Sequence, residues 1–219
     1  MSPIELRPFT LERVWTVEDI PVLTARITLP EPTHADTPTA RRIRRYYHFQ
    51  QRVFLRRYER ILFPRAETEY RAALEVSAPL PCFRAEVDFT VTYREGDLLS
   101  LYTQARETGL PGQKSLQRWG DTWNTATGYP MALPDFFPSH SGWKKEFLVR
   151  AEEEIHQQEE AGLARYHPHI RRTLRKHFNP RSYYLTPEGP TLFYPMGSIA
   201  PSAEGIPAFT IPFGPTPQP

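Results

Sequence analysis

Hydrophobic and polar residues alternate most regularly over residues 83–94. Every second residue from Phe83 to Tyr93 is apolar, and the residues between them are charged or carry a hydroxyl group. A period of two places each kind of side chain on its own face of a β-strand, as in an antiparallel sheet with one solvated face. Residues 95–97 read EGD and precede a second strand-like segment, 98–106, so we predict a hairpin.

Residues 38–62 follow the period of an amphipathic helix instead. Thr37 and Pro38 form a typical helix start, a capping hydroxyl followed by a proline at the first helical position. The apolar residues then recur at steps of three and four: Ile43, Tyr46, Tyr47, Phe54, Tyr58, Ile61 and Leu62. Pro64 is expected to end or restart this helix, and residues 66–74 to form a second helical segment.

Shorter segments complete the predicted fold. We expect strands at 22–29, 115–125, 182–186, 191–194 and 209–213, and helices that start near residues 143 and 166. This order predicts an α+β protein with a mostly antiparallel sheet, helices packed on one side, and two small subdomains sharing an interface. The subdomains are expected at residues 16–110 and 111–213, followed by a disordered tail at 214–219.

The composition is that of an ordinary globular protein. The 219 residues are 39% hydrophobic and 24% charged, and the formal net charge of +2 does not demand a nucleic-acid partner. The first residues lack the pattern of a signal peptide, and no apolar segment is long enough to span a bilayer. We therefore expect a cytoplasmic protein without membrane insertion. Cys82 is the single cysteine, which excludes an intrachain disulfide, and we expect its side chain to be buried.

Arginines gather on the predicted long helix. They are Arg41, Arg42, Arg44, Arg45, Arg52, Arg56, Arg57 and Arg60. Some recur at steps of four and seven and therefore share one stripe of the helix: Arg41, Arg45, Arg52 and Arg56. The simpler interpretation is the solvated side of an amphipathic helix. The alternative is an anion or nucleic-acid binder that uses the helix at 41–60, although we do not expect a nucleic-acid partner.

Trp119 and Trp123 are a candidate binding platform. They lie four residues apart on the predicted strand at 115–125, so both side chains share one face. Two neighbouring aromatic side chains on a strand can hold a sugar or a peptide. Packing in the core against the helix that carries Trp143 is the simpler interpretation.

The sequence contains no recognisable catalytic motif. It has no phosphate-binding loop, no dinucleotide fingerprint and no supported catalytic triad. His167, His169 and His177 lack the spacing and the partners of a metal site. We therefore predict no catalytic residue, no metal and no cofactor. The alternative is an enzyme whose site is assembled from scattered residues and acts on cell-wall carbohydrate.

Three segments carry a resemblance to a known family. Residues 123–128 read WNTATG, residues 133–137 read LPDFF, and residues 199–212 read IAPSAEGIPAFTIP. Together they resemble the RsiV-type domain of unknown function. This family includes the extracellular domain of the anti-sigma factor RsiV and the accessory region of some peptidoglycan deacetylases, which are extracytoplasmic proteins.

The resemblance implies a binding function for the loop at 196–207. In RsiV this domain recognises a protein, lysozyme, through surface loops that include the region matching Pro201 and its neighbours. This chain has Gly197 and Ser202 where the family usually has tyrosines, so those aromatic anchors are missing. We predict a non-enzymatic binding or sensing module that recognises a protein or a cell-wall-related ligand. The predicted contact residues are Pro201, Ser202, Ala203 and Glu204.

Overall fold

The computed structural model describes residues 4–109, 114–138 and 142–213. The strands are β1 (Leu6–Val17), β2 (Ile20–Pro32), β3 (Phe83–Glu95), β4 (Leu98–Thr108), β5 (Lys114–Asn124), β6 (Tyr129–Pro130), β7 (Tyr183–Thr186), β8 (Gly189–Phe193) and β9 (Ala208–Thr210). The helices are α1 (Pro38–Arg57), η1 (Tyr58–Leu62), α2 (Phe63–Glu75), η2 (Leu133–Phe136), α3 (Trp143–Glu160), α4 (Ile170–His177) and η3 (Ser202–Glu204). No helix within the described residues is long and apolar enough to cross a membrane.

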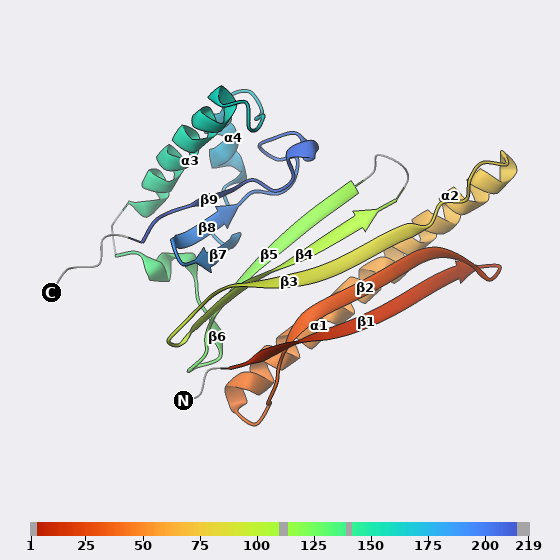
Figure 1. The fold of residues 1–219 in the computed structure, drawn as a ribbon, viewed down its shortest axis with the longest axis horizontal. Coiled ribbons are helices and arrows are strands. Elements are labelled where there is room, and N and C mark those ends of the chain that lie inside the picture. Colours follow the sequence, from red (N-terminus) through yellow and green to blue (C-terminus); the bar gives the residue numbers. More distant parts are fainter. Residues whose placement is uncertain (1–3, 110–113, 139–141, 214–219) are drawn as a thin grey trace. The chain divides into compact units, whose positions relative to one another are not determined.

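The strands form two sheets, and the fold is α+β as predicted (Figure 1). One sheet has the order β1-β2-β3-β4-β5-β6, and the other has the order β7-β8-β9. The chain divides into two compact units. The N-terminal unit holds Met1–Phe89, Thr103–Leu116 and Ala126–Gly128, and the C-terminal unit holds Thr90–Tyr102, Gln117–Thr125 and Tyr129–Pro219. Strands β3, β4 and β5 therefore contribute residues to both units. The subdomain boundary expected near residue 110 stays a prediction, and the tail expected at 214–219 lies outside the described residues.

The first strand, β1, was not predicted from the sequence. It forms a long antiparallel hairpin with β2, from the pair Leu6↔Pro32 to the pair Val17↔Ile20. The hairpin turns at Glu18 and Asp19, which both have positive φ angles, 50° and 67°. Two successive residues with positive φ form the turn whose twist matches that of the flanking strands. The strand predicted at 22–29 is confirmed and is longer than predicted.

One strand pair of the first sheet is parallel, which the sequence analysis did not anticipate. Strand β2 pairs with β3 in parallel from Leu23↔Phe83 to Ile27↔Val87. Parallel neighbours need a long connection, usually helical, and here α1, η1 and α2 provide it. The other strand pairs with a described register are antiparallel. They are β1 with β2, β5 with β6, β7 with β8, and β8 with β9.

The predicted long helix is confirmed, and it continues past Pro64. The hydroxyl oxygen of Thr37 accepts the backbone N–H of Ala40 at 3.1 Å, so the predicted cap is present. The helix widens into the π-helical turn η1, where Phe63 donates its N–H to the carbonyl oxygen of Tyr58. Pro64 has no N–H to donate, and the wider turn accommodates it without ending the helix.

The C-terminal unit contains the confirmed hairpin of β7 and β8, with β9 added at the edge of the second sheet. Its core joins residues of η2, α3, α4 and this sheet, among them Phe147, Ile155, Leu174 and Phe209. Gly120 of β5 lies against β7, because a Cβ atom at this position would stand 1.7 Å from the carbonyl oxygen of Tyr183. Only glycine allows this approach of two backbones.

Cys82 does not lie in the core, contrary to the sequence-based expectation. Its side chain is exposed, and the next residue, Phe83, is buried at the start of β3. Cys82 directly precedes β3, and the buried residues of the strand begin at Phe83.

Candidate ligand-binding groove

The predicted contact residues of the C-terminal loop are all at the surface. Pro201, Ser202, Ala203 and Glu204 are exposed, and the last three form the short helical turn η3. Immediately before them, Ile199 and Ala200 are fully buried. We call residues 201–204 the C-terminal turn.

Hydrogen bonds hold the loop that carries this turn. The carbonyl oxygen of Ile199 accepts the backbone N–H of His167 at 2.9 Å, and the carbonyl oxygen of Gly197 lies 3.3 Å from Nε2 of the same histidine. The hydroxyl of Ser198 donates to the carbonyl oxygen of Pro195 at 2.6 Å. These hydrogen bonds give the C-terminal turn a fixed support.

The two tryptophans proposed as a platform have different surroundings. Trp123 is buried, with 3% of its surface exposed, whereas Trp119 is 37% exposed. A platform needs both rings at the surface, and the structure places only one of them there. Trp123 is buried, and its packing against the helix that carries Trp143 stays a prediction.

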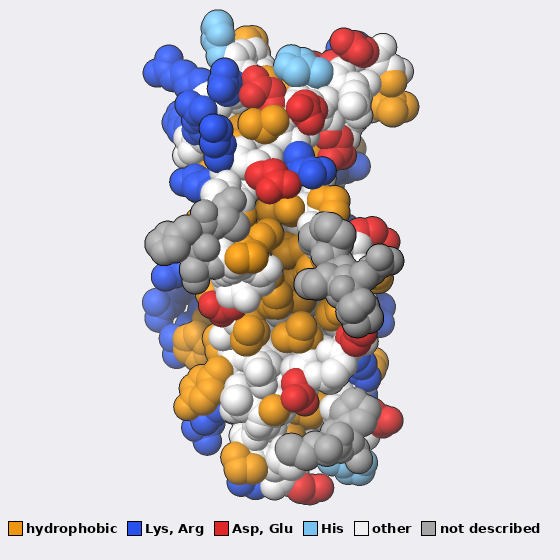
Figure 2. Space-filling model, turned by 90° about the vertical axis from the view of Figure 1, so that its left-hand side faces the viewer, with side chains coloured by type: hydrophobic (Ala, Val, Ile, Leu, Met, Phe, Trp, Pro, Cys, Tyr) orange, Lys and Arg blue, Asp and Glu red, His pale blue; other side chains and the backbone are white. Residues whose placement is uncertain are grey.

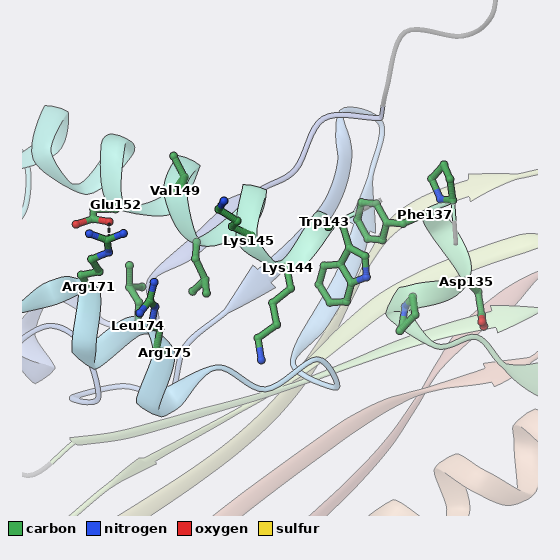
Figure 3. Close-up of a pocket in the computed structure, with 14 residues that line it drawn as sticks. Asp135, Phe137, Trp143, Lys144, Lys145, Val149, Glu152, Arg171, Leu174 and Arg175 are labelled. Carbon is green, nitrogen blue, oxygen red and sulfur yellow. Dashed lines mark ion pairs between the residues drawn. The ribbon is translucent and has the colours of Figure 1, made fainter. Parts of the chain in front are cut away.

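A groove that sequence reasoning missed lies between three segments of the C-terminal unit (Figure 3). Its volume is about 740 Å³, within the usual range for ligand sites. The lining residues are Pro134, Asp135, Phe137 and Pro138 before α3, Gly142, Trp143, Lys144, Lys145, Leu148, Val149 and Glu152 at the start and along one side of α3, and Arg171, Leu174 and Arg175 of α4.

The packing of the two helices positions the groove. Helix α3 buries Phe147, Ala151 and Ile155, which lie on one stripe at four-residue steps. Helix α4 buries Ile170 and Leu174 in the same core. The residues beside these stripes remain accessible at the joint between the helices, and they line the groove.

One end of the groove is aromatic. The rings of Phe137 and Trp143 stack with centroids 5.0 Å apart and planes 9° apart. The ring of Phe178 lies 6.0 Å from that of Trp143, at 42°. Trp143 thus already contacts two rings, which makes it a wall of the groove and leaves little of its face for stacking a sugar ring.

The other lining side chains make the groove positively charged. Arg171 pairs with Glu152 at 3.7 Å, and Nζ of Lys144 lies 4.5 Å from the centre of the Phe178 ring. Among the residues that the structure describes, neither Lys145 nor Arg175 has a carboxylate within 4.0 Å. In Figure 3 the Arg171 pair lies at one end, the aromatic pair towards the other, and Lys144 and Arg175 between them.

The carboxylates of the groove are already engaged. Asp135 accepts the backbone N–H of Ala132 at 2.8 Å, and Glu152 pairs with Arg171. Among the described residues that line the groove there is no serine, threonine, cysteine or histidine, and residues 139–141 lie outside the described part of the chain. Within the described part of the chain, no group of three or more His, Cys, Asp or Glu side chains could hold a metal ion. This set of residues is suited to binding an anion beside an apolar surface.

Figure 2 shows one face of the molecule with its side chains coloured by type. On this face Lys and Arg side chains lie together with Asp and Glu side chains in the upper part of the view. The sequence held one signal for the groove, since Lys144 and Lys145 are two of only four lysines in the chain and follow Trp143 directly. The contribution of α4 could not be read from the sequence, because it depends on how two helices pack.

One family model matches part of the chain. Residues 134–214 match a family described as a protein of unknown function (DUF3298). This segment contains every residue that lines the groove and also the C-terminal turn. No curated protein matches the sequence.

Two solved structures resemble the fold over nearly the whole chain. A member of the DUF3298 family from Bacteroides fragilis NCTC 9343 is 15% identical, with a TM-score of 0.63, and the match covers 96% of this chain and 90% of that one. A DUF3298 family protein from Pseudomonas aeruginosa PAO1 is 15% identical, with a TM-score of 0.56, and the match covers 97% and 92%. At this identity the likeness concerns the fold alone.

Proposed function

We propose that the protein is a non-enzymatic binding module that recognises a protein partner, and that the groove between α3 and α4 receives an acidic segment of this partner. The observation that carries the proposal is the combination of Lys145 and Arg175, which have no carboxylate partner among the described residues, with the apolar side chains of Leu148 and Val149. Clusters of basic side chains beside an apolar surface are a common means of recognising acidic peptide motifs.

A polypeptide segment fits this groove better than a sugar does. The cationic side chains come from two helices, so they can contact more than one carboxylate along an extended ligand. The aromatic pair of Phe137 and Trp143 offers an apolar wall for a large side chain of the ligand. A carbohydrate site would instead favour an aromatic ring with an open face.

The C-terminal turn is a second contact surface in this proposal. Pro201, Ser202, Ala203 and Glu204 are exposed on a hydrogen-bonded support, as a recognition loop requires. The resemblance of residues 199–212 to the RsiV-type domain, which recognises a protein through the corresponding loop, supports the same function. Trp119, which is partly exposed, is a further candidate contact residue.

Selection from a random peptide display library tests the groove and does not require an identified partner. We expect the selected peptides to be enriched in Asp and Glu next to a large apolar residue. They should lose binding to Val149→Asp, which places a negative charge on the groove wall at a residue that is 42% exposed. Leu163→Asp is the matched control, since Leu163 is 76% exposed and lies outside the groove. Peptides without acidic residues, or equal binding to both variants, would contradict the proposal.

A pull-down from the native host tests the C-terminal turn separately. The double variant Pro201→Ala, Glu204→Ala is compared with wild type and with Val149→Asp. A partner lost only in the turn variant places the main contact at residues 201–204. A partner lost only in Val149→Asp places it at the groove. A partner retained by both variants would contradict the assignment of either surface.

A further inference from the structure

Helix α1 carries an unusual set of charges. Its 20 residues include seven arginines and no Asp or Glu. One side of the helix is buried through Ile43, Tyr47 and Phe54 and packs against β2. The opposite side of the helix faces solvent and holds most of the arginines.

Arginines at the border of the buried side have partners within the N-terminal unit. Arg44 pairs with Glu31 at 3.0 Å, and Arg57 pairs with Glu107 at 2.7 Å. These two arginines have structural roles, so they do not count towards a binding surface. Their ion pairs stabilise the N-terminal unit, and the arginines of a binding surface are therefore sought among the others.

Three of the remaining arginines form an exposed row. Arg45, Arg52 and Arg56 are exposed and lie seven and four residues apart, which puts them on one stripe of the helix. None of the three has a carboxylate within 4.0 Å in the part of the chain that the structure describes. The stripe therefore presents a row of three positive charges from Arg45 to Arg56, a rise of about 17 Å along the helix.

An apolar edge runs beside this row. Phe49 is 55% exposed and Val53 is 48% exposed, and they lie four residues apart on α1. Ile61, in the π-helical turn that continues α1, is 55% exposed. Large apolar side chains are usually buried, and three of them next to a row of arginines need an explanation.

We propose that this outer face of α1 docks the protein on the surface of a bilayer that contains anionic lipids. The guanidinium groups of Arg45, Arg52 and Arg56 contact lipid phosphates, and Phe49, Val53 and Ile61 reach the boundary of the acyl chains. Basic residues interleaved with apolar ones are typical of helices that lie on membranes. The helix lies on the surface and does not cross the bilayer.

A nucleic acid would use the arginines but not the whole face. Arginine binds phosphate in either ligand, and an exposed Phe49 could stack on a base. Val53 and Ile61 have no ring to stack, so their exposure gains nothing from a nucleic acid. Insertion into a lipid interface uses all three apolar side chains, and the observations therefore favour the bilayer.

Co-sedimentation of the whole chain with vesicles tests the proposal. We expect the protein to bind phosphatidylcholine vesicles with 25% phosphatidylglycerol at least about tenfold more tightly than vesicles of pure phosphatidylcholine. Binding should weaken as salt is added, because salt screens charges beyond about 8 Å at physiological ionic strength. The affinity for the anionic vesicles should fall at least about tenfold in the triple variant Arg45→Glu, Arg52→Glu, Arg56→Glu. The control is the triple variant Arg94→Glu, Arg165→Glu, Arg181→Glu. It changes the net charge by the same amount at exposed sites outside α1, and it should retain its affinity for the vesicles.

A second variant keeps the test independent of charge. The double variant Phe49→Asn, Val53→Asn leaves every arginine in place and should still reduce binding to the anionic vesicles. Circular dichroism and thermal unfolding check that each variant is folded. Equal loss in the control, no effect of the Asn variant, or binding of a 20-nucleotide single strand in preference to vesicles would each overturn the proposal.

Discussion

Glu152 of α3 and Arg171 of α4 form an ion pair of 3.7 Å at the groove, while Arg175, one turn further along α4, has no such partner among the described residues. The pair joins the two helices that line the groove and neutralises one of its cations. The charge available to a ligand therefore depends on Glu152 as well as on the basic residues. This dependence can be tested with a single substitution.

Replacing Glu152 by Gln should tighten the binding of an acidic peptide. The substitution frees Arg171 and removes a negative charge from the groove, so we expect an affinity gain of about two- to fivefold. The ion pair is partly exposed, and its loss should cost less than about 1 kcal/mol of stability. Titration of a peptide selected by display measures the affinity. Glu160→Gln at the end of α3, outside the groove, is the control, and equal gains in both variants would contradict the role of Glu152.

Gly120 should tolerate no larger side chain. A Cβ atom there would lie 1.7 Å from the carbonyl oxygen of Tyr183, and this backbone atom cannot move aside without displacing β7. We expect Gly120→Ala to lower the free energy of unfolding by about 3 kcal/mol. Gln117→Ala, at an exposed site of the same strand, should change it by less than about 0.5 kcal/mol. Urea unfolding measures both, and an equally mild effect of the two substitutions would contradict the close packing.

Glu31 is the most enclosed carboxylate of the N-terminal unit, with 8% of its side chain exposed. It contacts Arg7 at 2.9 Å, Arg44 at 3.0 Å and His48 at 3.2 Å. Burial alone would raise the pKa of Glu31, but the hydrogen bonds of His48 and Arg7 and the positive charges of Arg44 and Arg7 outweigh it and lower the pKa.

This lowered pKa predicts acid sensitivity. The carboxylate stabilises the fold fully above its unfolded pKa near 4.5, and this stability is lost as the pH falls through the lower folded value. We expect Glu31→Gln to cost about 1–2 kcal/mol at pH 7 and progressively less below about pH 4.5. Glu12→Gln, which removes an ion pair with Arg26 between exposed side chains, should cost little at any pH. A constant cost of Glu31→Gln from pH 7 to pH 3 would contradict this account.

Two buried tyrosines should respond in opposite ways to the loss of their hydroxyl groups. The hydroxyl of Tyr58 is fully buried and has no hydrogen-bond partner among the described residues, so Tyr58→Phe should leave stability unchanged or raise it by about 1 kcal/mol. The hydroxyl of Tyr183 donates to the carbonyl oxygen of Met131 at 2.7 Å, so Tyr183→Phe should cost about 1 kcal/mol. Thermal unfolding of both variants measures the difference, and a cost for Tyr58→Phe would indicate a polar partner.

Elements with a strong local signal could be predicted from the sequence. The strict alternation of residues 83–94 predicted β3, and Thr37 with the apolar stripe that follows predicted the start of α1. The hairpin of β7 and β8 followed from its Pro-Glu-Gly turn. In each case the residues that determine the element are close together in the sequence.

Features that depend on residues far apart in the sequence could not be predicted. Strand β1 lies at the edge of its sheet and is exposed along most of its length, so its sequence has no clear apolar face. The parallel pairing of β2 with β3 joins residues about 60 positions apart. The groove combines Asp135, Lys145 and Arg175, and only the packing of α3 and α4 brings these residues together.

The central claim is that the groove binds an acidic segment of a partner, and charge reversal tests it most directly. A peptide selected by display is titrated calorimetrically into wild type and into two double variants. The groove variant carries Lys145→Glu with Arg175→Glu, and the control variant carries Arg172→Glu with Lys176→Glu. The last variant makes the same change of net charge at exposed residues of α4 that do not line the groove. We predict at least about tenfold weaker binding, or about 1.4 kcal/mol, for the groove variant only. Equal affinities for the two variants would contradict the claim.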